Sequence, residues 1–131
     1  ACWSRSTAPG QPVIPASAVV SSERLIMGER TAGVVDGDLG LTLAQLSETI
    51  RNRRDASPEQ SYTARLLTES VDLLLKKIGE ESTELVLAVK DDDHDHIRYE
   101  AADLLYHLLV LMERTGITGA ELAGELNARM H

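Results

Sequence analysis

Five acidic side chains stand at spacings that bring carboxylates together on helices. Glu80, Glu81 and Glu84 fall in one stretch of the sequence, and Glu100 and Asp103 fall in another. Residues three or four positions apart share a helix face, so Glu80 and Glu81 each share a face with Glu84, as Glu100 does with Asp103. Converging carboxylate oxygens bind hard divalent cations, and Mg²⁺ is the occupant that this donor set favours.

The two stretches lie on what we predict to be the main helices of the fold. Apolar periodicity predicts one helix over about 71–90 and a second over about 95–115. The turn between them, at Asp91–Asp93, is short, so we expect the two helices to pack antiparallel as a hairpin. The acids would then face each other across the hairpin.

Counting residues from the turn places the two acid pairs at about the same height along the hairpin. Glu84 and Glu100 are each about eight residues from the turn, and both helices rise about 1.5 Å per residue. Glu100 and Asp103 also lie in the apolar run IRYEAADLLYHLLVLM, where a buried carboxylate needs a counter-charge or a metal ion. An E-E-x-x-E run on a helix is, by itself, usually a solvated face; the second acid pair, inside an apolar helix and at matching height, favours a metal site.

The rest of residues 42–131 is also predicted to be helical, which makes the fold all-α. The elements in chain order are a helix from the N-cap Thr42 to the basic residues Arg51, Arg53 and Arg54, a loop over Asp55–Ser61, a short helix over Tyr62–Glu69, the two long helices, with Ser70 capping the first and Gly116 ending the second, and a last helix from a capping box at Thr118–Glu121 to about Met130.

Residues 1–40 differ in composition from the rest of the chain. They are rich in Ser, Ala and Pro and then punctuated by Gly, a composition that buries too little apolar surface to offset its ordering entropy. We interpret 1–40 as a flexible arm, with a short strand at 33–35 as a minor feature, and 41–131 as one helical domain. The arm is alternatively a cloning remnant or an over-early start, since Met27 would open a shorter chain.

The composition argues against several classes of function. A net charge of -8 disfavours binding to nucleic acid, because phosphate backbones need clustered Lys and Arg. Cys2 is the only cysteine, so no internal disulfide or thiolate zinc site is expected. The sequence has neither an apolar run long enough to span a bilayer nor a secretory signal pattern, so we expect a cytoplasmic protein that does not bind membranes.

The local sequence around the acids resembles that of a known family. KKIGEESTEL at 76–85, followed by YEAADLLYHLLV at 99–110, looks like the paired signature of the phosphoribosyl-ATP pyrophosphohydrolases, and SYTA with the following Leu66–Leu67 resembles the segment before their metal helix. These enzymes belong to the MazG-like all-α nucleoside-triphosphate pyrophosphohydrolases, which share E-E-x-x-E, a spacer and E-x-x-D. The resemblance covers about residues 42–131 and leaves the arm without a counterpart.

This resemblance implies both a fold and a reaction. The fold would be an antiparallel bundle of four to five helices, completed by dimerisation, and the reaction would be Mg²⁺-dependent hydrolysis of phosphoribosyl-ATP to phosphoribosyl-AMP and pyrophosphate in histidine biosynthesis. Following the superfamily pattern, Glu81, Glu84, Glu100 and Asp103 would bind Mg²⁺. Glu80 would hold a second ion or orient the attacking water.

Basic residues near the acids are candidates for binding the substrate. Lys76 and Lys77 lie one turn before the acids and would meet phosphate oxygens, although a surface-lysine interpretation is about equally good. Arg65 and Arg98 are weaker candidates of the same kind.

Histidines and one tyrosine near the acids admit more than one interpretation. His107, which follows Tyr106, is either a partner of Asp103 or a core or interface histidine with its own hydrogen bond. His94 and His96 are two positions apart and point away from each other on a helix, so we interpret them as part of a solvated cap.

We expect a homodimer, because Leu108, Leu109, Val110 and Leu111 ring their helix and would leave apolar surface exposed. The alternatives are a related pyrophosphohydrolase acting on dCTP or dUTP, and a non-enzymatic helical dimerisation module. A di-iron bundle would need Glu-x-x-His, but Leu104 stands three residues before His107, so that pattern fails.

Overall fold

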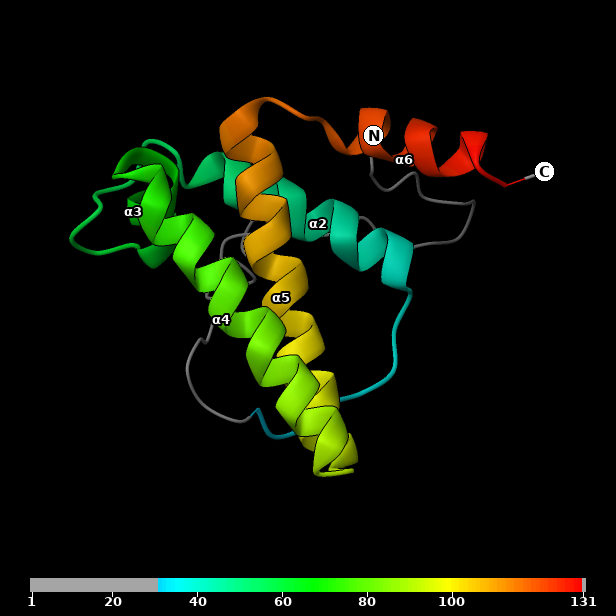
Figure 1. Cartoon of the computed structure of the whole chain (residues 1–131). Helices are drawn as coiled ribbons and strands as arrows, with labels where there is room; N and C mark the ends of the chain where they lie inside the picture. Colours follow the sequence, from blue (N-terminus) through cyan, green and yellow to red (C-terminus); the bar gives the residue numbers. More distant parts are fainter. Residues whose placement is uncertain (1–30, 131) are drawn as a thin grey trace.

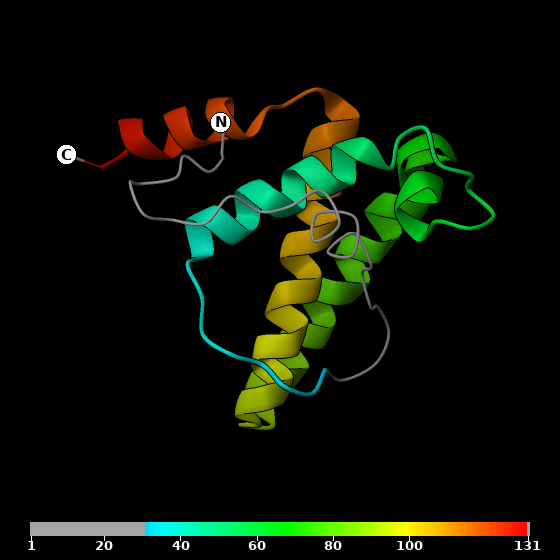
Figure 2. The ribbon, with the colours of Figure 1, turned by 180° about the vertical axis from the view of Figure 1, so that it is seen from behind.

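The computed structural model describes residues 31–130, and within that range the chain is all-α with no strand. Its helices are α2 (Leu39–Asn52), α3 (Tyr62–Thr68), α4 (Val71–Lys90), α5 (His94–Thr115) and α6 (Gly119–Ala128). The helices α4 and α5 form an antiparallel hairpin, as predicted (Figure 1). Seen from behind, α2 crosses α5, and α3 lies beside the start of α4, at the end of the hairpin opposite its turn (Figure 2).

Most helix boundaries follow the capping residues that the sequence offers. The prediction of a helix over 71–90 is confirmed, with the Ser70 hydroxyl accepting from the Asp72 amide. Gly116 ends α5 with a φ of 82°, a left-handed conformation that glycine adopts without strain. The Thr118 hydroxyl accepts from the Glu121 amide and begins α6, which ends two residues before the predicted Met130.

The predicted start of α2 is wrong. Asp38, and not Thr42, is the N-cap, because its carboxylate accepts a hydrogen bond of 2.9 Å from the Leu41 amide. The first turn of α2 therefore includes residues 39 and 40, which the composition places in the arm. The predicted strand at 33–35 is also absent, since residues 31–38 form no ladder with another described segment. The remainder of the predicted arm, residues 1–30 with Cys2 and Met27, lies outside the described residues.

The α4–α5 turn is built from three consecutive aspartates. Asp91 is the C-cap of α4, and Asp92 adopts a φ of 55°, a left-handed conformation that Asp tolerates better than most residues. Asp93 is the N-cap of α5, and its carboxylate accepts from the His96 amide. The turn therefore reverses the chain within a few residues and fixes the register of the two helices.

The core sits between α2, α3 and the end of the hairpin opposite its turn. Its buried cluster consists of Ile50, Leu66, Leu67, Leu74, Tyr106 and Val110. The expectation that residues 108–111 form exposed outer surface is therefore wrong for Val110, which is fully buried, and Leu109 and Leu111 pack partly against the same core. Leu108 does stay exposed. The cause is α2 and α3, which cover this side of α5.

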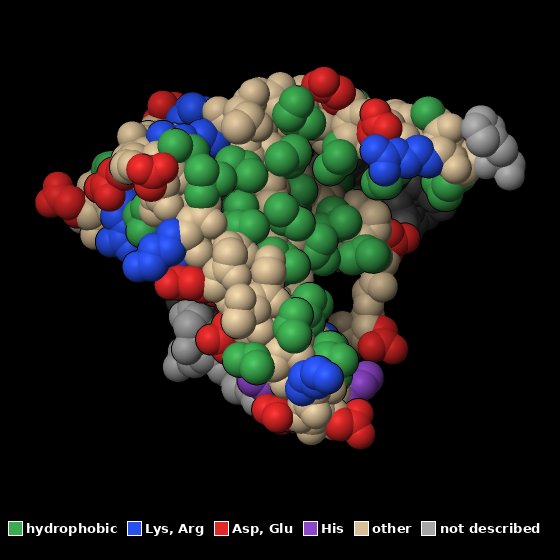
Figure 3. All heavy atoms as spheres, viewed as in Figure 1, with side chains coloured by type: hydrophobic (Ala, Val, Ile, Leu, Met, Phe, Trp, Pro, Cys, Tyr) green, Lys and Arg blue, Asp and Glu red, His purple; other side chains and the backbone are tan. Residues whose placement is uncertain are grey.

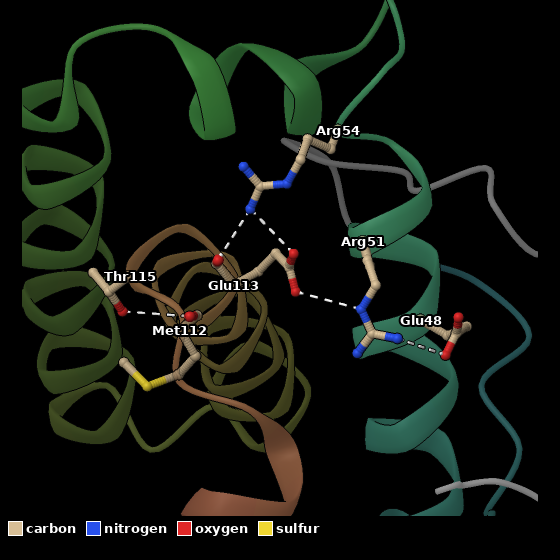
Figure 4. Close-up of polar contacts among 6 residues, drawn as sticks. All are labelled: Glu48, Arg51, Arg54, Met112, Glu113 and Thr115. Carbon is tan, nitrogen blue, oxygen red and sulfur yellow. Dashed lines mark hydrogen bonds and ion pairs between the residues drawn. The ribbon is translucent and has the colours of Figure 1, made fainter.

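Charged side chains hold α2 against the end of α5 (Figure 4). Arg54 donates to both the backbone carbonyl and the carboxylate of Glu113, at 3.0 and 3.1 Å, and Arg51 Nε lies 3.7 Å from the same carboxylate. Arg114 of α5 donates to the Leu66 carbonyl at 2.7 Å. The basic end of α2 is thus used to position α5.

Candidate metal centre between the two long helices

Potential ligand atoms from α4 and α5 gather in two adjacent sets. Within each set the candidate ligand atoms all lie within 4.8 Å of one another, and the two sets are Glu81 with Asp103 and His107, and Glu84 with His96 and Glu100. Each set draws on both helices, so four of the five acids singled out from the sequence converge across the hairpin. The equal-height argument places Glu84 opposite Glu100, as the structure does.

The acids nearest the core are buried, unlike carboxylates on a solvated face. Glu81 is 8% exposed and Glu100 is 6% exposed, and the Asp103 side chain is 10% exposed. The Oδ1 atom of Asp103 is buried, and no N–H or hydroxyl group in the described part of the chain donates to it; the carboxyl group of Glu81, when protonated, is the one neighbouring donor there. A buried polar atom without a partner costs about 1–3 kcal/mol. Its position beside Glu81 suits a cation ligand, since a hard cation would satisfy both this oxygen and a carboxylate oxygen of Glu81.

Burial and neighbouring acids together alter the titration of Glu81. Burial, followed by hydrogen bonding and charge from Asp103 and then from Glu100, raises the pKa of Glu81 from 4.5 to about 8. These neighbours favour the protonated form because a second carboxylate in a low-dielectric site repels ionisation. A bound divalent cation would reverse that preference and ionise the cluster.

Glu80 does not belong to either ligand set. Its side chain is 46% exposed and pairs with Lys76 at 3.9 Å and Lys77 at 3.6 Å. Lys77 Nζ also lies 4.0 Å from Glu81, so this ammonium borders the acid cluster while Lys76 remains at the surface.

The interpretation of His96 as part of a solvated cap is wrong. Its Nε2 lies 2.9 Å from Oε2 of the buried Glu100, and its side chain is only partly exposed. The usable signal in the sequence is the spacing of four residues from His96 to Glu100, which places both on one face of α5. His94 is exposed, in agreement with the cap interpretation.

The position of His107 accommodates both alternatives that the sequence leaves open. The residue is buried, and its Nδ1 lies 2.8 Å from the backbone carbonyl of Asp103 and 3.6 Å from the carboxylate of the same residue. Its second nitrogen is hydrogen-bonded to Tyr62, a residue that sequence reasoning did not select. Tyr106 points elsewhere, with its hydroxyl 2.6 Å from that of Thr63.

The two candidate arginines are not in contact with the acids. Arg65 lies over the ring of Tyr62, with 5.4 Å between its Cζ and the ring centroid. Arg98 forms an exposed ion pair with Asp95 at 3.1 Å, close to the turn of the hairpin. Of the basic candidates, Lys77 is the one that the described structure places at the edge of the cluster.

Comparison with known proteins now identifies the family. Residues 43–130 match the family profile described as phosphoribosyl-ATP pyrophosphohydrolase. The chain belongs to this family. The matched segment includes all five acids and every described helix except the first turn of α2.

Curated members of this family align over the same segment. A phosphoribosyl-ATP pyrophosphatase from Methylibium petroleiphilum is 48% identical over 88 residues, which cover 67% of this chain and 73% of that protein. A second, from Dechloromonas aromatica, is 46% identical over 87 residues, 66% of this chain and 81% of that protein. A histidine biosynthesis bifunctional protein from Thermus thermophilus is 43% identical over 104 residues, 76% of this chain and 49% of that protein.

Proposed function

We propose that this chain hydrolyses phosphoribosyl-ATP to phosphoribosyl-AMP and pyrophosphate, the second step of histidine biosynthesis, and that it requires Mg²⁺. Membership of the phosphoribosyl-ATP pyrophosphohydrolase family supports the substrate and the reaction. The observation that carries the metal requirement is the buried, unpartnered Oδ1 of Asp103 beside the buried Glu81. A purely structural hairpin would gain nothing from leaving such an atom unsatisfied.

Four acids would hold the ion in this proposal. They are Glu81, Glu84, Glu100 and Asp103, whose oxygens lie in the two adjacent ligand sets. When bound, Mg²⁺ supplies charge neutralisation at phosphate oxygens and lowers the pKa of a coordinated water. His96 would hold Glu100 in place through its hydrogen bond.

The reaction places particular demands on the remaining residues. The oxygen of water bonds to the α-phosphorus and its protons pass to solvent, while the bond from that phosphorus to the α–β bridging oxygen breaks and pyrophosphate leaves with the bonding electron pair. Catalysis of such a transfer rests on positioning and charge stabilisation more than on covalent chemistry. Glu80, exposed at the rim, would orient the water or hold a second ion, and Lys76 and Lys77 would bind phosphate oxygens. Arg65 and Arg98 would contact the substrate further out.

The test is a direct assay of pyrophosphate release. Purified protein would be given phosphoribosyl-ATP, dCTP or dUTP, each with Mg²⁺ and with a chelator. We expect Mg²⁺-dependent release from phosphoribosyl-ATP, little from the deoxynucleotides, and none with the chelator. Preference for dCTP or dUTP would instead assign the chain to the related pyrophosphohydrolase activity.

We also infer that two copies of the chain associate, in the cytoplasm. Apolar side chains gather on the face of the molecule formed by the hairpin (Figure 3). Exposed residues on this hairpin include Leu75, Val86 and Val89 of α4 and Leu105 and Leu108 of α5. Contiguous apolar surface of this kind marks an interaction site in a folded protein.

The described part of the chain contains no helix with the length and apolar character needed to cross a membrane.

Sedimentation would decide the oligomeric state. Wild-type protein should sediment as a dimer, and Leu105→Glu or Leu108→Glu should shift it towards the monomer because a charge in an apolar interface is poorly solvated. A wild-type monomer at all concentrations would contradict the inference.

A further inference from the structure

The hydrogen bonds of His107 fix which of its ring nitrogens carries the proton. Its Nδ1 lies 2.8 Å from the backbone carbonyl of Asp103, and its Nε2 lies 2.9 Å from the hydroxyl of Tyr62. A carbonyl can only accept, so Nδ1 must be the donor. The side chain is 1% exposed, and its two ring nitrogens face one carbonyl, which only accepts, and one hydroxyl, which can donate. In the neutral ring Nε2 then accepts, and the Tyr62 hydroxyl donates.

This tautomer determines what His107 can do beside the acid cluster. It belongs, by distance, to a possible ligand set with Glu81 and Asp103, and its Nδ1 is 3.6 Å from Asp103 Oδ1. A protonated ring nitrogen has no lone pair to offer a metal ion. Nδ1 is therefore directed at the Asp103 turn of α5 as a donor, while the lone pair of Nε2 is engaged by Tyr62.

We propose that Tyr62 and His107 form a positioning relay for Asp103, in which the Tyr62 hydroxyl of α3 fixes the ring of His107 and Nδ1–H fixes the backbone carbonyl of Asp103, and with it the turn of α5 that carries the carboxylate. The relay rests on the proposed function, because it is Asp103 as a cation ligand that needs positioning. It assigns neither residue to the metal. Partners of this kind set the orientation of the groups that bind an ion, and their loss weakens ion binding without removing a ligand.

The same helix junction contains a second bond that serves as a control. Thr63 is the residue after Tyr62 on α3, and Tyr106 is the residue before His107 on α5. Their hydroxyls are 2.6 Å apart. Both bonds therefore join α3 to α5 through a tyrosine hydroxyl within the described structure. Only the Tyr62 bond leads through His107 to Asp103. Tyr62→Phe and Tyr106→Phe each remove one hydroxyl and keep the ring, so they separate positioning from general stabilisation.

The first measurement is the ¹⁵N spectrum of His107 in metal-free protein. We expect Nδ1 to be the protonated nitrogen and Nε2 the unprotonated one in wild type and in Tyr106→Phe, and this assignment to persist on addition of Mg²⁺. In Tyr62→Phe, Nε2 should shift as it loses its donor. A proton on Nε2 would contradict the assigned tautomer, and loss of the Nδ1 proton on addition of Mg²⁺ would show that His107 is a ligand. Either result would overturn the relay.

The second measurement is ion binding, with and without substrate. The concentration of Mg²⁺ giving half-maximal turnover should rise about threefold to tenfold in Tyr62→Phe, less than the loss of about 10- to 100-fold typical of removing a direct partner of a ligand. The KM for nucleotide should change little. Mn²⁺ binding to substrate-free protein should weaken in parallel, and Tyr106→Phe should leave both ion affinities near wild type.

The outcomes distinguish the relay from the proposed function. Equal effects of the two tyrosine variants on ion binding would reduce the Tyr62–His107 bond to a packing contact. If wild type shows the predicted tautomer and Tyr62→Phe alone weakens Mn²⁺ binding, but phosphoribosyl-ATP is not hydrolysed, the relay stands and the substrate assignment fails. If Tyr62→Phe does not fold, the wild-type tautomer with and without Mg²⁺ still decides whether His107 is a ligand.

Discussion

Replacement of Glu81 by glutamine should stabilise the metal-free protein while abolishing its activity. The pKa of Glu81 is raised from 4.5 to about 8, chiefly by burial and then by Asp103 and Glu100. Below about pH 8 the folded protein keeps this carboxyl protonated, whereas the unfolded chain ionises it above about pH 4.5. Wild-type stability should therefore fall as pH rises from 4.5 to about 8 and level off above that range.

The size of the effect is obtained from the shift. Between about pH 6 and about pH 9, Glu81 increasingly destabilises the folded protein, and the increase covers the two pH units up to its pKa of about 8. At about 1.4 kcal/mol per unit, the upper limit of this increase is about 2.7 kcal/mol. Solvent entry and side-chain relaxation reduce this limit, so we expect the advantage of Glu81→Gln to grow by about 1.5 kcal/mol over that interval. Both pH values lie above the sequence pI of about 4.9, where the protein carries net charge.

Urea unfolding with a chelator present, followed by circular dichroism, measures this advantage at both pH values. Glu59→Gln is the control, since Glu59 is exposed in the loop between α2 and α3 and should show no such growth. Addition of Mg²⁺ should stabilise wild type more than Glu81→Gln. A stability difference between wild type and Glu81→Gln that stays the same from about pH 6 to about pH 9 would refute the reasoning.

Three further results are expected. Mg²⁺ affinity in calorimetry should rise with pH up to about 8 and then flatten, with protons released to the buffer below that value, because the ion binds ionised Glu81; an affinity independent of pH would contradict this. Asp103→Asn and Glu84→Gln should lose turnover and keep their helical spectrum, whereas a non-enzymatic dimerisation module would only gain stability. Gly116→Ala should lower the free energy of unfolding by about 1 kcal/mol, measured in urea, because the φ of 82° is strained for alanine.

Local signals in the sequence predict the hairpin well because its determinants are local. The N-cap Ser70 and the C-terminal Gly116 act through hydrogen bonds or dihedral angles within a turn of their own helix, so residue type is enough to locate them. The convergence of Glu84 and Glu100 requires only the helix rise and a short turn. Thr42 is misleading because Asp38, a better cap, stands one turn earlier.

Contacts between distant segments could not be predicted in the same way. The position of α3 against α5 buries Val110 and brings the Tyr62 hydroxyl to His107, and no periodicity within either helix specifies that pairing. His96 is a different kind of error. Its partner Glu100 lies within the same helix, but the neighbouring aspartates suggest a solvated terminus.

All of the acids proposed to bind the ion lie on α4 and α5, which are consecutive in the chain and joined by three aspartates. Closing such a hairpin costs little loop entropy, so contacts between these helices can form early during folding. All of the ligands are then supplied by one contiguous segment, while α2 and α6 contribute none of them. Substitutions in those two helices can alter stability or assembly over evolutionary time without removing a single carboxylate from the centre.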